Sequence, residues 1–411
     1  EKIGLYFSNL DHLITLHHRK YMKYADLSVF DWEQRKLVDL VDRVTRKNQD
    51  LVSELPLTIS AQYGLIDQNE FFDKRVASKD VSGYYLIENG EFAYNKSTST
   101  DAPWGAIKRL DRYKNGVLST LYIVFGIKEN NPVDSDFLVS YYSTNLWHKG
   151  IHEIAAEGAR NHGLLNIAPA DFFETKLMIP QDIEEQKKIG KYFEELERLI
   201  TLHQRKCEET KTLKKYMLQK MFPQNGHSVP EIRFSGFTED WEQRKLGELG
   251  SLKNGMNFSK EAMGIGFPFV NLQNIFGNNV IDVTNLGKAM ASDSQLKDYN
   301  LLNGDVLFVR SSVKLEGVGE AALVPQNLEN TTYSGFIIRF RDEYGLDNNF
   351  KRFLFGIESV RNQIMAQATN SANKNISQTV LENLCLKIPN KSEQEKIGLY
   401  FSNLDHLITL H

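Results

Sequence analysis

One helical sequence occurs three times in this chain of 411 residues. EKIGLYFSNLDHLITLH stands at residues 1–17 and again, unchanged, at residues 395–411, and the looser copy KKIGKYFEELERLITLH lies at residues 187–203. An internal repeat constrains a fold more than any local propensity, because repeated sequence implies one structural unit used more than once. The chain is therefore predicted to be built from copies of a single unit.

Shorter matches extend the repeat beyond the helix. DWEQRKL occurs at residues 31–37 and 240–246, and in both halves an Ile-Pro step precedes a Glu-Gln pair and then the KIG helix. YYLIENGEFAYNKS also parallels YNLLNGDVLFVRSS, which places Lys96 opposite Arg310. The expected order along the chain is a variable globular body, a helix, a second body and a second helix.

Composition places the chain in the soluble globular class, with 41% hydrophobic and 25% charged residues. The two cysteines, Cys207 and Cys385, form no CxxC pair, which fits a reducing, cytoplasmic location. No apolar run approaches the roughly 20 residues that a membrane helix needs, and no signal peptide precedes the first helix, so no membrane association is expected. The formal charge of −4 means that affinity for nucleic acid would have to come from local basic patches.

The bodies are predicted to have a mixed α/β fold. Short β-branched and aromatic runs alternate with Gly and Asn turns, which is typical of strands, and a helical stretch follows late in each body. We expect two similar domains separated by long antiparallel coiled-coil helices in a pseudo-twofold repeat. The expected boundaries are a first helix at 1–24, domain 1 at 29–182, a central helix at 183–222, a linker at 223–237, domain 2 at 238–390 and a last helix at 391–411.

A heptad-like apolar seam supports the pairing of these helices. Such a stripe also fits a helix packed on its own globular core, but its recurrence at both body ends favours a mutual coiled coil. The seam residues predicted to pair the helices are Ile3, Phe7, Leu10 and Ile14, then Ile189, Phe193, Leu196 and Ile200, then Ile397, Phe401, Leu404 and Ile408.

This arrangement resembles the specificity (S) subunit of type I restriction–modification enzymes. The resemblance covers nearly the whole chain, and its most specific parts are the DWEQRKL segments, the IP…EQ…KIG helix starts and the loops GARNHGLLNI and NSANKNIS. It implies two target-recognition domains that each read one half of a bipartite site in double-stranded DNA. It also implies helices that set the gap between the half-sites and dock two methyltransferase subunits.

The resemblance implies that the chain itself has no catalytic residues and no cofactor. S-adenosylmethionine is expected on the methyltransferase subunits, and ATP and magnesium on the restriction subunits of the full complex. The helix at residues 1–24 departs from the family pattern, in which the chain starts near the first W-E-x-x-K-L segment. Because the family architecture is pseudo-cyclic, we interpret the duplicated helix as a circular-permutation-like or engineered feature. One copy is then redundant or pairs with a neighbouring molecule.

Candidate DNA contacts come from polar and basic segments between the expected strands, since base edges are read by directed donors and acceptors. These clusters fall at what the repeat suggests are corresponding places, yet their residues differ, which suits two readers of unlike half-sites. A solvated turn would look similar at any single cluster. The candidates are Lys96, Lys108, Arg109, Arg112, Lys114, Arg160, Asn161 and His162 in domain 1, and Arg310, Ser311, Ser312, Lys314, Asn370, Asn373, Lys374 and Asn375 in domain 2.

Catalytic motifs are missing from the sequence. The N/D-P-P-Y/F motif of adenine methyltransferases is represented by no more than Asn131-Pro132-Val133, and there is no G-x-x-x-x-G-K-[ST] phosphate loop. Two further readings stay open beside the resemblance. One is a two-headed protein-binding scaffold without DNA recognition, and the other is a fused methylase or nuclease with unrecognised motifs.

One histidine pair has the spacing of a metal site. His148 and His152 stand four residues apart on an expected helix. Their counterparts in the repeat are Arg361 and Met365, which cannot act as an equivalent pair of zinc ligands. A helix-surface pair is therefore favoured, and no metal site is expected.

Overall fold

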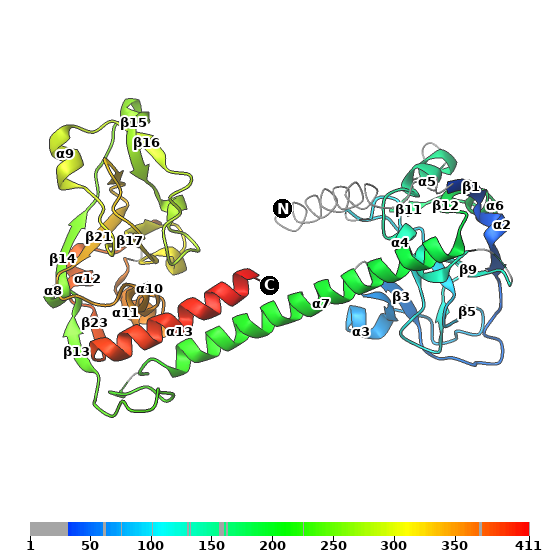
Figure 1. Ribbon diagram of the computed structural model, residues 1–411, viewed down its shortest axis with the longest axis horizontal. Coiled ribbons are helices and arrows are strands. Elements are labelled where there is room, and N and C mark those ends of the chain that lie inside the picture. The colour runs from blue at the N-terminus through cyan, green and yellow to red at the C-terminus, as the bar shows by residue number, and fades with distance from the viewer. Residues whose placement is uncertain are drawn as a thin grey trace. The chain divides into compact units, whose positions relative to one another are not determined.

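The computed structural model describes residues 32–60, 63–74, 76–100, 102–129, 131, 133–155, 160–161, 163–224, 226–369 and 372–410. The first copy of the repeated helix, with its predicted seam Ile3, Phe7, Leu10 and Ile14, lies outside these ranges. The chain divides into two compact units, Glu1–Ile200 and Thr201–His411 (Figure 1). Each unit has a large hydrophobic core of its own.

The first unit is built on a four-stranded antiparallel sheet with the order β2-β9-β6-β7. These strands are β2 (Val41–Val44), β9 (Ile123–Ile127), β6 (Phe92–Asn95) and β7 (Ala106–Arg109). The smaller strands are β1 (Trp32–Lys36), β3 (Leu57–Ser60), β4 (Gly64–Asp67), β5 (Tyr85–Glu88), β8 (Asn115–Leu118), β10 (Arg160–Asn161), β11 (Leu164–Leu165) and β12 (Lys176–Pro180). The helices are α2 (Leu37–Leu40), α3 (Gln68–Phe72), α4 (Ser135–Tyr142), α5 (His148–Ile154), α6 (Pro169–Phe173) and the start of α7 (Ile183–Lys220).

The second unit repeats this plan with the sheet order β14-β21-β17-β19. These strands are β14 (Gly250–Asn254), β21 (Ile337–Asp342), β17 (Val306–Val309) and β19 (Ala321–Leu323). The smaller strands are β13 (Glu242–Lys245), β15 (Met263–Val270), β16 (Gly287–Ala289), β18 (Ser311–Ser312), β20 (Thr332–Tyr333), β22 (Lys374–Asn375) and β23 (Cys385–Ile388). The helices are α8 (Leu246–Leu249), α9 (Asp293–Asp298), α10 (Asn348–Leu354), α11 (Glu358–Gln367), α12 (Gln378–Glu382), α13 (Lys391–Leu410) and short 3₁₀ turns at Lys260–Ala262, Leu272–Asn274 and Leu315–Gly317.

The inner strands β6 and β17 are buried on both faces of their sheets, which explains why they are apolar at successive positions. In β17, Val306 and Phe308 face a core with α10, α11 and α13, whereas Leu307 and Val309 face a second core with β15 and β20. In the first unit, Phe92 and Phe125 likewise face α4 and α6, whereas Ala93 of β6 and Val124 of β9 face β3, β5 and β8. Successive side chains of a strand point to opposite faces, so covering both faces requires apolar residues at every position. The predicted mixed α/β repeat is confirmed.

The first and last strands of each unit pair with one another. In the first unit β1 is antiparallel to β12, with Trp32 opposite Pro180, and in the second β13 is antiparallel to β23, with Glu242 opposite Ile388. The repeated DWEQRKL segment therefore supplies the strand that holds the Ile-Pro strand in register. The globular body of each unit consequently starts and finishes at the same place, and the KIG helix follows directly after its last strand.

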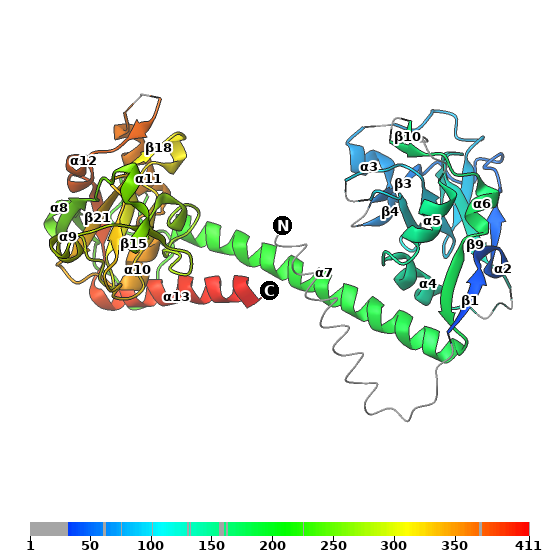
Figure 2. The same cartoon turned by 90° about the horizontal axis from the view of Figure 1, so that it is seen from above.

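Within the second unit, the C-terminal part of α7 runs antiparallel to α13, as both views show (Figures 1 and 2). The Cys207 thiol donates to the Ile408 carbonyl over 3.8 Å, and Lys214 forms an ion pair with Asp405. Just beyond α7, the ring of Phe222 stacks on that of Phe401 with 6.1 Å between centroids. Rising residue numbers on one helix meet falling numbers on the other, which is the antiparallel direction.

The predicted seam also contributes to the domain cores. Ile397, Phe401 and Leu404 are buried in the core that contains α10, with the Phe353 ring 5.3 Å from that of Phe401. Ile408 and the four seam residues of α7, Ile189, Phe193, Leu196 and Ile200, are half-buried. Periodicity identified the apolar face of the helix but could not separate contacts to a second helix from contacts to the helix's own domain.

Truncation of Phe401 tests the core that holds α13. Phe401→Ala removes a fully buried ring and should lower the free energy of unfolding by about 3–5 kcal/mol. Leu399→Ala is the matched control, because Leu399 lies on the same helix with 58% of its surface exposed and should cost less than ~0.5 kcal/mol. Denaturant unfolding, with hydrogen exchange followed on peptides of the second unit, measures both. Equal effects of the two variants would contradict the packing described.

Candidate nucleic-acid interface

Two polar segments of the second unit, distant in sequence, form a small ribbon. Strand β18 is antiparallel to β22, with Ser311 opposite Asn375 and Ser312 opposite Lys374. At its base the Ile376 amide donates to the Arg310 carbonyl over 3.0 Å. We call residues 310–312 and 374–376 the second ribbon. The predicted candidates from FVRSSVK and NSANKNIS are thus brought together directly after the central strand β17.

The first unit has a ribbon at the equivalent place. The Leu165 amide donates to the Lys96 carbonyl over 2.9 Å, and the Thr98 amide donates to the Gly163 carbonyl over 2.6 Å. Residues 96–98, which follow the central strand β6, therefore lie beside the β10–β11 hairpin. We call residues 96–98, 160–161 and 163–165 the first ribbon. Lys96 and Arg310 occupy matching positions at the bases of the two ribbons.

Both basic side chains at the ribbon bases are held by backbone oxygens. The Lys96 ammonium donates to the Ile167 carbonyl over 3.4 Å, and an Arg310 Nη donates to the Gly335 carbonyl over 3.4 Å. Burial lowers the pKa of Lys96, because desolvation disfavours the charged form. A nearby anion would oppose that shift, so this position favours an anionic ligand.

Exposed side chains surround the second ribbon. Lys314 and Asn373 are exposed. Val313, which connects β18 to Lys314, is 78% exposed. A shallow hollow of about 510 Å³ adjoins them and is lined by Phe276 and Phe336, among others. The Asn375 amide group donates to the Asn373 carbonyl over 2.8 Å, which orders the loop that carries these groups. Sequence analysis missed the apolar members of this surface, because scattered Val and Phe residues give no polar signal.

Some predicted residues are not placed by the structure. His162 and Asn370 lie outside the described residues, and for Arg160 and Asn161 the backbone alone is described, as strand β10. Gly163, next to His162, belongs to the first ribbon, and the amide of Thr369, next to Asn370, donates to the Asn375 carbonyl of the second ribbon over 3.0 Å.

The KRLDRYK cluster of the first unit does not join the first ribbon. Lys96 follows the last residue of β6, whereas Arg109 pairs with the first residue of that strand, so the cluster that continues to Lys114 lies at the opposite end. The strand equivalent to β7 in the second unit is β19, not the ribbon. KRLDRYK and FVRSSVK therefore do not stand at corresponding places in the two units, whereas Lys96 and Arg310 do, as the repeat predicted.

Arg109 has a structural role within the first unit. Its guanidinium donates to Asp111 at 2.6 Å and to Ser135 and Asp136 at 2.7 Å, and its side chain is 16% exposed. These contacts tie β7 to the N-terminus of α4. Lys108 is half-buried on β7, while Arg112 and Lys114 are exposed in the following turn. These contacts favour a structural role for Arg109, and as DNA contacts all four residues stay predictions.

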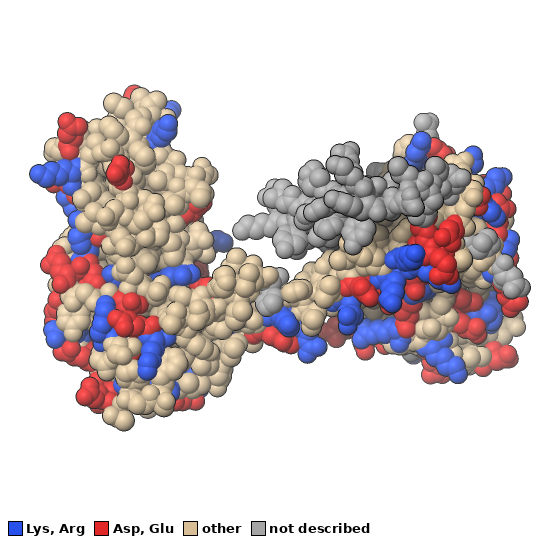
Figure 3. Space-filling model, viewed as in Figure 1, with Lys and Arg blue, Asp and Glu red and all other residues tan. Residues whose placement is uncertain are grey.

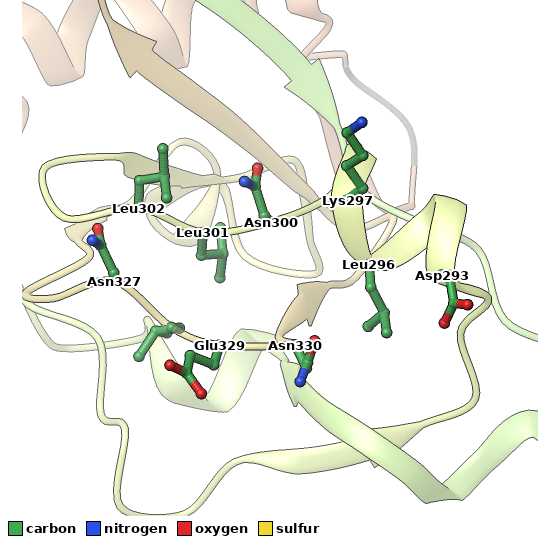
Figure 4. Close-up of a pocket in the computed structure, with 10 residues that line it drawn as sticks. Asp293, Leu296, Lys297, Asn300, Leu301, Leu302, Asn327, Glu329 and Asn330 are labelled. Atoms are coloured by element: carbon green, nitrogen blue, oxygen red, sulfur yellow. The ribbon is translucent and has the colours of Figure 1, made fainter.

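Basic and acidic side chains are mixed on the face of the molecule that Figure 3 presents. Figure 3 shows Lys and Arg interspersed with Asp and Glu over the described residues of the face it presents. A hollow of about 410 Å³ in the second unit is lined by α9 and by residues 300–302 and 327–330. In Figure 4, Asp293 and Lys297 of α9 point in opposite directions, so they form no converging catalytic pair. Among the described residues, no cluster of His, Cys, Asp and Glu suits a metal ion, and no helix is long and apolar enough to cross a membrane.

Comparison with known proteins gives one consistent family. The family described as "Type I restriction modification DNA specificity domain" matches residues 31–212 and 238–411. The type I restriction enzyme EcoKI specificity subunit of Escherichia coli is 25% identical over 284 residues, which span 66% of this chain and 58% of that protein. The type I restriction enzyme MjaVIII specificity subunit of Methanocaldococcus jannaschii is 22% identical over 92% of this chain and 87% of that protein.

Two solved structures share the fold. The S subunit of a type I restriction–modification system from M. genitalium matches with a TM-score of 0.54 and 12% identity over 94% of this chain and 92% of that chain. A chain from a structure of the type I R-M system, concerned with complex assembly and conformational transition, matches with a TM-score of 0.50 and 17% identity over 92% of this chain and 91% of that chain.

Replacement of Arg109 tests whether it is structural. Arg109→Met keeps the aliphatic stem but removes three charge-assisted contacts, so it should lower the free energy of unfolding by about 1–3 kcal/mol. Arg112→Met is the matched control, because the exposed Arg112 should contribute less than ~0.5 kcal/mol. Thermal and denaturant unfolding of the two variants measures the difference. A neutral Arg109→Met would show that these ion pairs do not hold α4 against the sheet.

Proposed function

The chain belongs to the family of type I restriction modification DNA specificity domains, and from this membership we propose that it is the targeting subunit of a type I restriction–modification complex. The family match covers both units and confirms the resemblance that the sequence motifs indicated. The observation that carries the proposal is that the two units build the same ribbon at the same place and furnish it with different side chains. Two surfaces with the same backbone arrangement but different side chains suit the recognition of two DNA half-sites with different sequences.

The ribbons are suited to reading base edges. The major groove of B-DNA is about 12 Å wide and admits a two-stranded ribbon. Arg310 can donate two parallel hydrogen bonds to a guanine edge, whereas Lys96 acts as a point donor. Asn373 and Asn375 add side-chain amides, and the exposed Lys314 is placed for a phosphate. On this proposal each ribbon specifies one half of a bipartite site in double-stranded DNA.

The helices supply the gap and the docking surfaces in this proposal. Helix α7 has 38 residues and is therefore about 57 Å long at ~1.5 Å per residue. Successive major-groove faces on one side of DNA recur about every 34 Å, so a helix of this length can span a site with unread bases in its middle. Large apolar side chains stay exposed along α7 and α13, which suits the docking of methyltransferase subunits: Tyr192, Leu199, Leu202, Leu213, Tyr216, Leu399, Leu407 and Leu410.

Catalysis is assigned to the partners. We infer a non-catalytic role for this chain from its membership of the specificity-domain family. S-adenosylmethionine would then be held by the methyltransferase subunits, and ATP and magnesium by the restriction subunits. The open reading of a two-headed protein scaffold has no specific observation in its favour.

Methylation patterns test the assignment of the two ribbons. The chain co-expressed with type I methyltransferase subunits should direct adenine methylation to a split motif with a fixed gap. Arg310→Met should relax one half of that motif and Lys96→Met the other, since each lost base contact costs about 1–3 kcal/mol of discrimination. Sequencing that detects methylated adenine reads the motif for each variant.

Arg244→Met is the control for these variants, because Arg244 lies on β13 beside Glu242, away from the second ribbon. Its motif should match that of the unchanged chain. If Arg310→Met altered both halves equally or neither half, the assignment of the second ribbon to one half-site would be refuted.

The salt dependence of DNA binding tests which basic cluster meets the backbone. Lys314→Met should reduce the slope of log affinity against log salt by about 0.9, the value for one phosphate contact on duplex DNA. If the ribbons and not the KRLDRYK cluster meet the backbone, Arg112→Met should leave the slope unchanged, because that cluster lies at the opposite end of β6 from the first ribbon. Titration of the assembled complex with its cognate duplex at several salt concentrations measures both slopes. A reduced slope for Arg112→Met together with an unchanged slope for Lys314→Met would instead assign the phosphate contact to the KRLDRYK cluster.

A further inference from the structure

A buried glutamine joins each KIG helix to its own domain in the same way. The Gln186 side chain donates from Nε2 to the Pro180 carbonyl and accepts at Oε1 from the Asp134 amide, both over 2.8 Å. The Gln394 side chain donates to the Pro389 carbonyl over 2.9 Å and accepts from the Asp347 amide over 3.0 Å. Gln186 is fully buried and Gln394 is 3% exposed. Both ends of each amide group are therefore fixed.

The residue that each glutamine reaches begins a helix of the domain. Asp134 caps α4 by accepting from the Phe137 amide over 3.0 Å, and Asp347 caps α10 by accepting from the Phe350 amide over 2.8 Å. Each glutamine thus links three points: the end of the last strand, the first turn of the KIG helix and the N-terminus of the domain helix. Sliding or rotating the KIG helix would break at least one of these bonds.

A glycine one turn later brings the two helices into close contact. A Cβ atom on Gly190 would lie 2.7 Å from the Phe137 nitrogen of α4, and one on Gly398 would lie 2.7 Å from the Phe350 nitrogen of α10. Backbone atoms cannot give way as the end of a flexible side chain can. Glutamine and glycine stand four residues apart, so they lie on the same face of the helix. We call this arrangement the Gln–Gly joint.

The Gln–Gly joint constrains the helix more tightly than hydrophobic packing alone would. A helix docked by its apolar seam alone could pivot on that seam, because hydrophobic contact is not directional. The double hydrogen bond sets the rotation and the axial position of the helix, and the glycine sets the distance of closest approach. Both units use the same pair of residues for this purpose, although their ribbons differ.

We propose that the two Gln–Gly joints are positioning devices that give the recognised DNA site a single gap length. This inference rests on the proposed function. Each joint fixes the angle between a KIG helix and the sheet whose central strand leads into the ribbon. A domain of ~150 residues has a radius of gyration of about 15 Å. A tilt of about 10° at the joint moves a point ~25 Å away by about 4 Å, which exceeds the ~3.4 Å rise of one base pair.

The test compares gap lengths in methylated DNA. Complexes of the full chain with type I methyltransferase subunits, carrying Gly190→Ala or Gly398→Ala, should methylate sites whose gap is one base pair longer or shorter, in addition to the original sites. The ratio of shifted to original sites should rise by roughly tenfold or more, since displacements near 1 Å can change rates on the order of a hundredfold. Thermal unfolding of each complex is recorded in parallel.

Gly150→Ala in α5 is the matched control, because a Cβ atom there meets the Thr175 side chain at an ordinary 3.6 Å. Its gap spectrum should equal that of the unchanged chain. Gln186→Met keeps the side-chain length but removes both hydrogen bonds, and it should also broaden the gap. If Gly190→Ala or Gly398→Ala prevents assembly of the complex, the gap spectrum of Gln186→Met provides the test instead.

The outcomes separate this inference from the proposed function. A lower yield of methylation at every site with an unchanged gap would reduce the joint to a purely structural element and overturn the inference, while the targeting function stands. If the unchanged complex produced no split motif at all, the proposed function would fail and the inference with it.

Discussion

The pairing of the first and last strands of each unit is the constraint on which the rest of the structure depends. Because β1 is antiparallel to β12 and β13 to β23, each domain starts and finishes at one edge. The KIG helix must leave from that edge, and in the second unit the preceding helix arrives there as well. Phe222, just after α7, can therefore stack on Phe401 of α13 although the two are far apart in sequence. A domain closed in this way behaves as an insertion between neighbouring helices.

The sequence predicted the frame of this fold well. DWEQRKL and the Ile-Pro step marked the two strands that close each unit, and the apolar runs marked β6 and β17, because strands buried on both faces must be apolar throughout. The limits of the seam interpretation are visible at Ile397. Ile397 stands at an apolar position of the heptad pattern, yet its side chain packs in the core of its own domain. Periodicity reports that one face of a helix is covered and does not report by what.

The candidate site was predicted less completely, for reasons of chain geometry. NSANKNIS and FVRSSVK were both selected for their polar residues, but nothing local indicates that Ser311 pairs with Asn375, because that pairing is set by tertiary structure. Arg109 shows the same limit of local sequence. It stands in a basic run, yet its guanidinium pairs with Asp111 and Asp136 once the sheet and α4 meet. The Gln–Gly joint gave a sequence signal, EQ…KIG in both halves, whose meaning required the positions of α4 and α10.

The way the ribbons are held explains how one frame can carry two specificities. The bonds at their bases join backbone atoms: the Lys96 carbonyl with the Leu165 amide, and the Arg310 carbonyl with the Ile376 amide. Backbone pairing does not depend on side-chain identity, so the residues on a ribbon can change without loss of its geometry. The positions that cannot change lie elsewhere, at buried Gln186 and Gln394, where both ends of the side chain are committed. In the proposed function, variable readout and fixed placement are therefore carried by separate residues, and this separation lets two copies of one domain read two unlike half-sites.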